Sequence, residues 1–289
     1  MCLRPPTPDD APGVVRVLAA RDTADLGVSA VPPGGVQQDW RAGDLAADAV
    51  VADDPRAGIV GYALVRASRT IAVVHPDHER RGLGARLLAW AEERADAAGH
   101  RRRQWVGADN ARARTLLLAA GYHGIGSWWR MGRALDGALE PPRVPAGVAL
   151  RAVDPVADAA ALHALDAEVF AANSEYEPMS LQVFRRDHLE PPGIDHGISR
   201  IAERDGVPVG LMLARRWDRA GHVDVLGVHP RERGRGLGAA LLGAALTGFA
   251  EAGLPEAHLG VAADNAPARR LYERAGMRPR FRVDGYERR

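Results

Sequence analysis

Apolar and polar positions follow two periods along the chain, and both periods occur in each half. Short apolar runs predict strands, and apolar stripes that recur every three to four residues predict amphipathic helices. The predicted strands are 3–6, 49–52, 59–66, 70–74, 105–108, 128–131, 148–151, 199–203, 207–215, 223–228, 258–262 and 280–283. The predicted helices begin at 7–10 and cover 83–91, 111–120, 156–170, 181–188, 237–245 and 267–275, and loops are expected at 22–44 and over most of 173–197. This mixture predicts α/β domains, each a mixed, mostly antiparallel sheet flanked by helices.

The second half of the chain repeats the first at an offset of about 150 residues. Six positions separate Pro76 from Gly82 after one apolar run, and six separate Pro230 from Gly236 after another. A repeat of this length indicates a duplicated domain rather than a solenoid. We expect an N-terminal domain, a proline-rich linker and a C-terminal domain, and their ranges are 1–139, 140–147 and 148–289.

Residues 223–245 carry the strongest chemical signal. A short apolar strand ends at His229-Pro230, an arginine- and glycine-rich loop follows, and an amphipathic helix begins at Leu237. Backbone N–H groups at such a helix start converge on one point, where the helix dipole adds positive charge. Glycines let an anion approach the backbone, so this stretch predicts a phosphate-binding site. The alternative without function is an exposed basic turn.

Three families of phosphate-binding loop can be compared with this stretch. A P-loop needs a lysine after its last glycine, and the chain contains no lysine. Residues 234–239 fit a dinucleotide-binding fingerprint, but residues 229–233 separate them from their strand, and Glu256 lies before the next apolar run rather than at its end. A dehydrogenase therefore stays an alternative that NAD binding would test.

The loop resembles the pyrophosphate loop of the GNAT acetyltransferase superfamily, which follows the pattern Gln/Arg-x-x-Gly-x-Gly/Ala. Arg233-Gly234-Arg235-Gly236-Leu237-Gly238 agrees with it at every defined position. The resemblance covers most of both halves and is weakest over 19–48 and 171–197. It implies a tandem of two GNAT-like domains that uses acetyl-coenzyme A. Mycothiol synthases share this two-domain plan, although the resemblance assigns no substrate.

The resemblance also implies site residues in the second half. The cofactor-binding residues it implies are Leu226, Gly227, Val228, Arg233, Gly234, Arg235, Gly236, Leu237, Gly238, Ala239 and Asn265. Tyr272 takes the position of the family's tyrosine that protonates the departing thiolate. Each assignment has a structural alternative. Tyr272 belongs to a helical apolar stripe and could be core, and Asn265 could be only a helix cap.

An alkyl ammonium acceptor must lose a proton before it attacks, so the reaction needs a base. His222 and Asp224 are the candidates, because strand parity is expected to place them on the same face as Leu226 and Val228. Either could instead be a polar residue at the opening of a strand. Acidic residues of the loop region could attract a cationic amine or be solvated surface: Glu175, Glu177, Asp187 and Asp195.

The first half departs from the pattern where chemistry matters. Its candidate cofactor site comprises Val74, Arg80, Arg81, Gly82, Gly84 and Asn110. Glu79 stands where the family has Gln or Arg, and a negative charge beside a pyrophosphate is unfavourable. Leu117 stands at the position of Tyr272. We expect a catalytically silent N-terminal domain that either binds coenzyme A or serves as a degenerate structural partner.

Composition narrows the remaining choices. A net charge of +1 argues against nucleic-acid and membrane-surface partners. The single cysteine, Cys2, excludes an intramolecular disulfide and a cysteine zinc site, and no metal is expected. No apolar stretch approaches ~20 residues, so a cytoplasmic location is expected.

The expected function is transfer of an acetyl group from acetyl-coenzyme A to a primary amine of a small molecule in the C-terminal domain. A protein terminus or lysine as acceptor remains open. A non-catalytic acyl-coenzyme A sensor is the alternative from another class. We expect either a monomer with pseudo-twofold domains or a homodimer.

Overall fold

The structure, a computed structural model, describes residues 2–29, 31, 34–41, 43–66, 70–137, 139–173, 176, 178–217 and 219–288. Its contacts divide the chain into two compact units that are not continuous in sequence. Unit 1 comprises Met1–Trp129, Ala262–Asp264 and Arg280–Arg289, and unit 2 comprises Arg130–Val261 and Asn265–Pro279. This division differs from a boundary at 140–147, because each half of the sequence contributes residues to the unit formed mainly by the other half.

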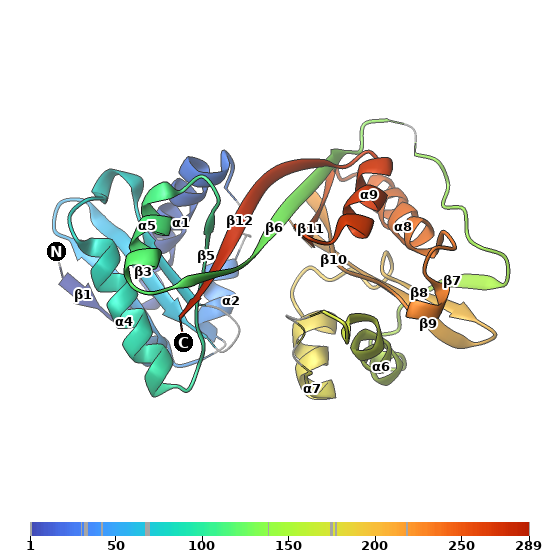
Figure 1. The fold of residues 1–289 in the computed structure, drawn as a ribbon, viewed down its shortest axis with the longest axis horizontal. Helices are drawn as coiled ribbons and strands as arrows, with labels where there is room; N and C mark the ends of the chain where they lie inside the picture. Colours follow the sequence, from blue (N-terminus) through green and yellow to red (C-terminus); the bar gives the residue numbers. More distant parts are fainter. Residues whose placement is uncertain are drawn as a thin grey trace. The chain divides into compact units, whose positions relative to one another are not determined.

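Unit 1 has a helix layer on each face of an antiparallel sheet with the strand order β1-β2-β3-β4 (Figure 1). Its elements are β1 (Cys2–Arg4), α1 (Ala11–Leu26), α2 (Gly35–Arg41), α3 (Leu45–Asp48), β2 (Ala49–Asp54), β3 (Gly58–Val65), β4 (Thr70–Val74), α4 (Leu83–Ala97), β5 (Arg102–Gly107) and α5 (Ala111–Ala119). Short 3-10 turns occupy Pro8–Asp10 and Pro76–His78. The last strand, β12 (Arg278–Arg288), pairs with β5 in antiparallel fashion.

Both faces of the β1–β4 sheet are buried, which explains why its strands read as apolar runs rather than as alternation. Val51 and Tyr62 pack with Val14 of α1 on one face. Val50 packs with Leu87 of α4 on the other. Neighbouring residues of a strand point to opposite faces, so a strand covered on both sides is apolar throughout.

Unit 2 has the strand order β7-β8-β9-β10-β11, antiparallel except for the parallel pair β10 and β11. Its elements are β7 (Val148–Ala152), α6 (Ala159–Phe170), α7 (Leu181–Phe184) with a π-helical continuation (Arg185–Leu189), β8 (Arg200–Arg204), β9 (Val207–Trp217), β10 (Ala220–Val228), a 3-10 turn (Pro230–Glu232), α8 (Leu237–Glu251), β11 (Glu256–Ala262) and α9 (Ala266–Arg274). Helix α6 covers one face, where Val169 packs with Val225. Helix α8 covers the other, where Phe249 lies so close to Gly221 that no Cβ would fit.

The predicted fold class is confirmed: mixed α/β, with helices that flank mostly antiparallel sheets. The predicted hairpin turn at Asp205-Gly206 is present, with φ angles of 51° and 77°. Two successive residues in the left-handed region are what a two-residue hairpin loop requires. Residues 140–147 contain no helix or strand.

The prediction of loop throughout 22–44 is wrong. Helix α1 extends to Leu26, and α2 buries Val36 and Trp40, which lie four positions apart on one helix face. The Trp40 indole N–H donates to the Tyr62 hydroxyl at 2.9 Å. Two apolar positions among polar ones were too weak a signal for a helix.

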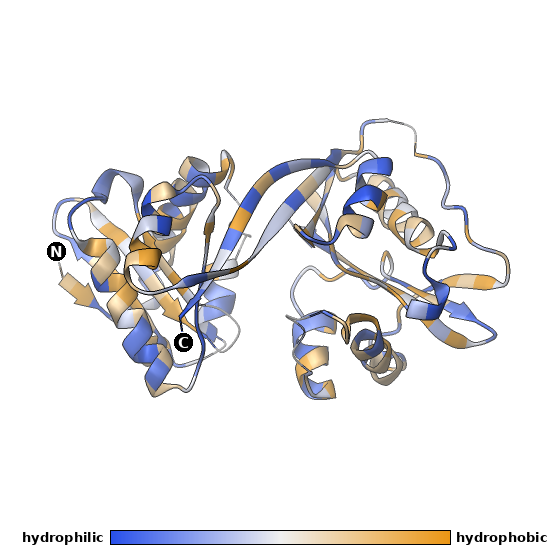
Figure 2. Cartoon of the chain, viewed as in Figure 1, coloured by the Kyte–Doolittle hydropathy of each residue, from blue (hydrophilic) through white to orange (hydrophobic). Residues whose placement is uncertain are grey.

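Strands β6 (His123–Ala134) and β12 are 12 and 11 residues long, much longer than the predicted 128–131 and 280–283. In Figure 2 β12 is mostly blue with a few orange positions and β6 is mostly pale, so neither strand is a continuous apolar run. Hydrophobicity predicts where a strand is buried, and therefore it missed the polar ends of these two.

Candidate active site

Strand β10 is paired on both sides over only part of its length. It pairs with β11 in parallel as far as Val223, and beyond that point its partner among the described residues is β9 alone. The N–H of His229 donates to the Val209 carbonyl near the start of β9 (2.9 Å). Because backbone groups alternate in direction along a strand, the N–H groups of Leu226 and Val228 point to the open edge. This edge could accept an extended ligand as an added strand.

A β-bulge at Asp224 changes which way the side chains of β10 point. The flanking residues Val223 and Val225 lie opposite consecutive residues of β9, so Asp224 is the extra residue. One extra residue reverses the alternation of faces from that point on. The expectation that His222 and Asp224 share a face with Leu226 is therefore wrong.

The face that carries His222 and Asp224 is the one covered by α6. The bulge places both residues on the same face as Gly227, and a Cβ on Gly227 would lie 2.8 Å from Val169 of α6. The Asp224 carboxylate accepts a hydrogen bond from Nε of Arg215 (2.6 Å) and lies 3.5 Å from Nε2 of His222. The two candidate bases thus lie together, next to the open edge.

The His222 ring lies in a cluster of aromatic and cationic side chains. It stacks on Trp217, with ring centroids 4.8 Å apart, and Nη1 of Arg130 lies 2.9 and 3.0 Å from its two nitrogens. Burial, reinforced by Arg130 and Arg215, lowers the pKa of His222 well below its ordinary value. Burial raises the pKa of Asp224, while Arg215 acts in the opposite direction. The imidazole is therefore neutral near pH 7 and able to accept a proton, although two guanidinium groups oppose its charged form.

The glycine loop after β10 has an open outer surface. Gly234 and Gly236 have φ angles of 76° and 87°, and a Cβ on either would meet nothing within 4 Å. The first N–H groups of the following helix have no partner within that helix, so they are available to an anion. Arg233 was expected to add charge for the phosphate. Its guanidinium instead donates to the main-chain carbonyls of Val228 (3.1 Å) and Val169 (2.9 Å), which braces the loop.

The other predicted loop residues complete the start of α8. Arg235 lies 3.5 Å from the carboxylate of Glu232. Leu237 is buried and anchors the first turn. A Cβ on Gly238 would lie 3.2 Å from Leu271 of α9, and Ala239 is exposed.

Tyr272 lies in α9 and Asn265 precedes its first residue, and the structural alternative stands for both. Tyr272 is 7% exposed, and burial raises its pKa to about 12, so the hydroxyl stays protonated near pH 7 and can donate a proton. Oδ1 of Asn265 accepts from the N–H of Ala268 (3.1 Å), which is a helix cap. Its Nδ2 has no hydrogen-bond partner among the described residues.

In unit 1 the corresponding loop carries a network of charged side chains. Glu79 forms ion pairs with Arg21 (2.5 Å) and Arg112. Arg21 also binds Asp25 (2.7 Å), to which Nδ2 of Asn110 donates (2.8 Å). Burial opposes ionisation of Glu79, but the two arginines outweigh it and lower its pKa. Burial raises the pKa of Asp25 against the effect of Asn110 and Arg21. The network links α1, the loop after β4 and the start of α5.

The backbone of this loop nevertheless matches that of unit 2. Arg80 has a φ of 59°, left-handed like Gly234, and Gly82 has a φ of 73° and precedes α4 as Gly236 precedes α8. The other members of the second candidate site surround it: Val74 ends β4, Arg81 is exposed and Gly84 lies in the first turn of α4. Leu117, at the position of Tyr272, is buried in an apolar cluster.

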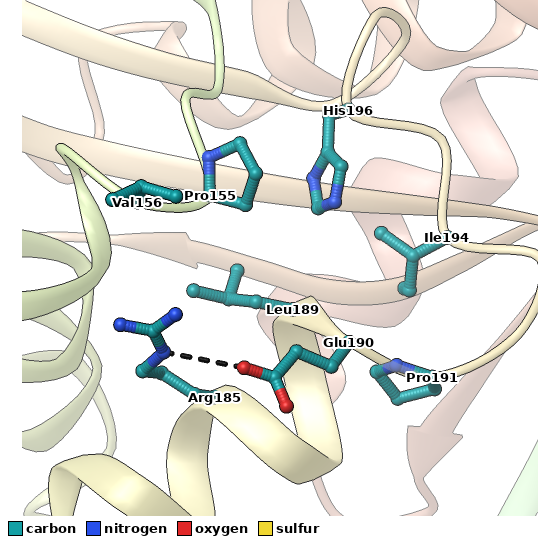
Figure 3. A pocket seen from close by; sticks show the side chains of 8 residues that line it. All are labelled: Pro155, Val156, Arg185, Leu189, Glu190, Pro191, Ile194 and His196. Carbon is teal, nitrogen blue, oxygen red and sulfur yellow. Dashed lines mark hydrogen bonds and ion pairs between the residues drawn. The ribbon is translucent and has the colours of Figure 1, made fainter.

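The acidic residues of the loop region differ in what can be said of them. Asp187 and Asp195 each pair with a neighbouring arginine, at 2.6 and 2.7 Å. Glu175 and Glu177 lie outside the described residues. A pocket of about 400 Å³ in this region contains none of the predicted site residues. Figure 3 shows the Arg185–Glu190 ion pair (3.3 Å) among its lining side chains.

Sequence reasoning missed four side chains of this part of unit 2: Arg130, Arg215, Trp217 and Asp166. Arg215 and Trp217 alternate along the end of β9, a period-two signal that could have been found. Asp166 interrupts the apolar stripe of α6; it is 3% exposed, and burial raises its pKa to about 6 while Tyr176 opposes the shift. Arg130 is 92 positions from His222, and no local pattern joins them.

The class of protein follows from the fold: two units, each with a mostly antiparallel sheet, flanking helices and a glycine loop that leads from a strand into a helix. The model of the acetyltransferase (GNAT) family matches residues 26–122 and 159–277. The chain belongs to this family and is an acyltransferase, as the sequence indicated in preference to a non-catalytic sensor.

Relatives and solved structures agree with this assignment. A mycothiol acetyltransferase of Thermobispora bispora is 38% identical over 73% of this chain and 72% of its own length. One of Kineococcus radiotolerans is 34% identical over 94% and 91%. A GCN5-related N-acetyltransferase from Sphaerobacter thermophilus has a TM-score of 0.86 at 27% identity, over 99% of this chain and 95% of that one. A tandem GNAT protein from the clavulanic acid biosynthesis pathway shares the fold, with a TM-score of 0.71 at 21% identity over 99% and 98%.

The described residues offer neither a cluster of metal ligands nor a membrane-spanning helix. No group of three or more His, Cys, Asp or Glu there is placed to hold a metal ion. None of the helices in that part of the chain has both the length and the apolarity to cross a membrane.

Proposed function

We propose that this enzyme transfers an acetyl group from acetyl-coenzyme A to the primary amine of a small molecule, and that unit 2 carries the reaction. The observation that carries the proposal is the open edge of β10, which leads directly into the glycine loop. Main-chain donors of Leu226 and Val228 face that edge, and the loop surface above Gly234 and Gly236 is free of side chains.

The residues of the edge and the loop fit the two ends of the donor. The thioester is the chemistry that acetyl-coenzyme A supplies when bound. The N–H groups of the loop up to Ala239 hold the pyrophosphate, where the dipole of α8 favours negative charge. The N–H of Leu226 polarises the thioester carbonyl, since a main-chain donor stabilises the oxygen as negative charge develops. The free Nδ2 of Asn265 adds a further donor at the start of α9.

Two proton transfers fall to side chains of unit 2. Tyr272 donates its proton to the departing thiolate, since its hydroxyl is protonated at neutral pH. The His222–Asp224 pair accepts the proton of the amine, directly or through water. The neutral amine nitrogen would bond to the acetyl carbon, and the carbon–sulfur bond would break as the thiolate leaves and takes up the proton of Tyr272.

Unit 1 takes no part in the chemistry in this proposal. Leu117 cannot donate a proton, and the network around Glu79 and Asp25 engages the side chains that would meet a cofactor there. The N-terminal half thus serves as a degenerate structural partner.

The direct test is an acetyl-coenzyme A consumption screen of the full chain over a panel of primary amines, with thiol release as the readout. We expect acetylation of at least one class of small amine, confirmed by mass spectrometry of the product. A chain that binds coenzyme A and acetylates no small amine but modifies a protein terminus or lysine would contradict the proposed acceptor.

A further inference from the structure

Arg130, at the middle of β6, is a cation of unit 2 without an anion of its own. Its Nη1 contacts His222 at 2.9 Å, and its guanidinium lies 6.0 Å from the ring centroid of Trp217. Neither contact supplies negative charge, and no carboxylate of a described residue forms an ion pair with it. Nε and Nη2 have no hydrogen-bond partner in the described part of the chain, and neither is among the fully buried atoms. Two donors of Arg130 are therefore available to a ligand.

The charges around Arg130 do not balance. Asp224, the nearest carboxylate, is engaged by Arg215 through a 2.6 Å hydrogen bond. With a neutral His222, two guanidinium groups and one carboxylate leave one positive charge uncompensated. Burial lowers the pKa of Arg130, and the charge of Asp224 opposes this only in part. An uncompensated charge removed from water is unfavourable, so binding of a monoanion would stabilise the cluster.

The cluster lies where an acceptor has to approach. His222 and Asp224 directly precede the open edge, and Asp224 is two positions, roughly 7 Å along a strand, from Leu226. When the amine nitrogen of an acceptor attacks a carbonyl held at Leu226, a second group of the acceptor, a few bonds from that nitrogen, can therefore reach the cluster around Arg130. The planar fork of a guanidinium matches the two oxygens of a carboxylate.

We propose that Arg130 binds a carboxylate of the acceptor, so that the enzyme acetylates amino acids or other amines with a carboxylate a few bonds from the nitrogen. This inference rests on the proposed function. The single uncompensated charge selects a carboxylate rather than a phosphate dianion.

The experiment compares matched acceptors on the full chain: amino acids of different amine-to-carboxylate spacing, the carboxamide of each, the amine that lacks the group, and phosphoethanolamine. Initial rates of thiol release are measured at saturating acetyl-coenzyme A. For at least one spacing we expect kcat/KM to be at least 10-fold higher for the acid than for its carboxamide, the usual scale of a charge-assisted hydrogen bond. The difference should lie mainly in KM.

Arg130→Gln should raise KM for the preferred acid about 10- to 100-fold and leave KM for its carboxamide unchanged. Arg130→Lys keeps the charge but loses the planar fork of the guanidinium, so its KM for the acid should lie between those of the wild type and Arg130→Gln. Arg219→Gln removes an exposed arginine just before β10 and is the matched control, with no expected change for either acceptor. Thermal midpoints establish that each variant is folded.

The outcomes separate the two proposals. Two results would mean that Arg130 has only a structural role, without contradicting the proposed function. One is an equal kcat/KM for the acids and their carboxamides; the other is an equal loss of kcat/KM for both acceptors in Arg130→Gln. A preference for phosphoethanolamine over every carboxylate would overturn the choice of anion. If no amine of the panel is acetylated, the proposed function fails and this inference fails with it. If Arg130→Gln does not fold, Arg130→Lys decides by the same acid-to-carboxamide ratio.

Discussion

Units 1 and 2 place an asparagine at the same point, the start of the helix after the fifth strand, and use it differently. In both, Oδ1 caps the helix: Asn110 accepts from Ala113 at 2.9 Å, and Asn265 accepts from Ala268 at 3.1 Å. In unit 1 the Nδ2 of Asn110 donates to Asp25 (2.8 Å). In unit 2 the Nδ2 of Asn265 has no partner in the described residues. The side-chain N–H donor is therefore engaged within unit 1 and has no protein partner among the described residues of unit 2.

The first residue of the glycine loop shows the same contrast. In unit 1, Glu79 forms ion pairs with Arg21 and Arg112, which lie over the loop. In unit 2, Arg233 donates to two main-chain carbonyls instead, and the loop stays uncovered. The backbones of the two loops agree, even where Arg80 replaces a glycine in the left-handed region. Side-chain partners thus cover one copy of the loop and leave the other open, although the two backbones agree.

The largest effect should come from Tyr272. Tyr272→Phe keeps the ring in its buried place but removes the proton donor, so we expect kcat to fall about 10²-fold or more with little change in thermal midpoint. Affinity for acetyl-coenzyme A, measured by calorimetry, should be unchanged. Wild-type turnover in this variant would return Tyr272 to a purely structural role.

The reciprocal change in unit 1 is the control for that prediction. Leu117→Tyr should create no activity when unit 2 carries Tyr272→Phe, because β4 offers no titratable side chain. Thiol release from the double variant above that of Tyr272→Phe alone would show that unit 1 lacks only the acid. Activity that survives in residues 1–139 alone would place the chemistry in the N-terminal half and contradict its assignment to unit 2.

A second, smaller effect is expected at the loop glycines. Gly236→Asp places a negative charge where the pyrophosphate should lie and should weaken acetyl-coenzyme A binding at least 10-fold, about 1.4 kcal/mol. Asparagine has the same shape as aspartate and is among the residues that tolerate a positive φ such as the 87° found here. Gly236→Asn therefore separates the effect of charge from that of backbone strain, and it should cost less affinity than Gly236→Asp. Calorimetry measures both.

Gly82→Asp makes the same change in unit 1, and we expect neither affinity nor kcat to move. Wild-type calorimetry should give one bound acetyl-coenzyme A per chain. A stoichiometry of two, reduced to one by Gly82→Asp, would show that the Glu79 network does not close that site. Unchanged affinity in a folded Gly236→Asp variant would remove the loop from the cofactor site.

The elements built from local apolar patterns could be predicted from sequence, and the site only in part. Strand β4, the glycine loops and the helix starts follow from periodicity and capping over short windows. The face on which His222 lies could not be predicted in this way, because the bulge at Asp224 is a single-residue insertion that leaves no mark in the apolar pattern. Arg130 was out of reach, because a contact over 92 positions depends on the tertiary fold.

The smallest predicted effect concerns what the two units have kept in common. Arg4 binds Asp10 (2.7 Å) in unit 1, and Arg151 binds Asp158 (2.7 Å) in unit 2. Each carboxylate also accepts a main-chain N–H, from Thr7 at 2.7 Å and from Asp154 at 2.8 Å. The arginine in each case is the main cause of a lowered carboxyl pKa. This ion pair is therefore present in both units, although the side chains around the two glycine loops differ.

Because the folded pKa is lowered, each carboxylate stabilises its unit at a pH above the ordinary value near ~4, and the stabilisation is lost as the pH falls through the folded pKa. Asp10→Asn and Asp158→Asn should each cost about 1 kcal/mol at pH 7, since the arginines are partly exposed, and lower the thermal midpoint by roughly 2–4 °C. Below about pH 3 the difference from wild type should shrink, because the unfolded carboxylate is then protonated while the native one still resists protonation, and it should vanish as the pH falls through the folded pKa. Circular dichroism melts at both pH values measure this. Equal losses in the two variants would mean that the ion pair stabilises both units alike; a loss in only one would mean that the units have diverged in this part of their framework.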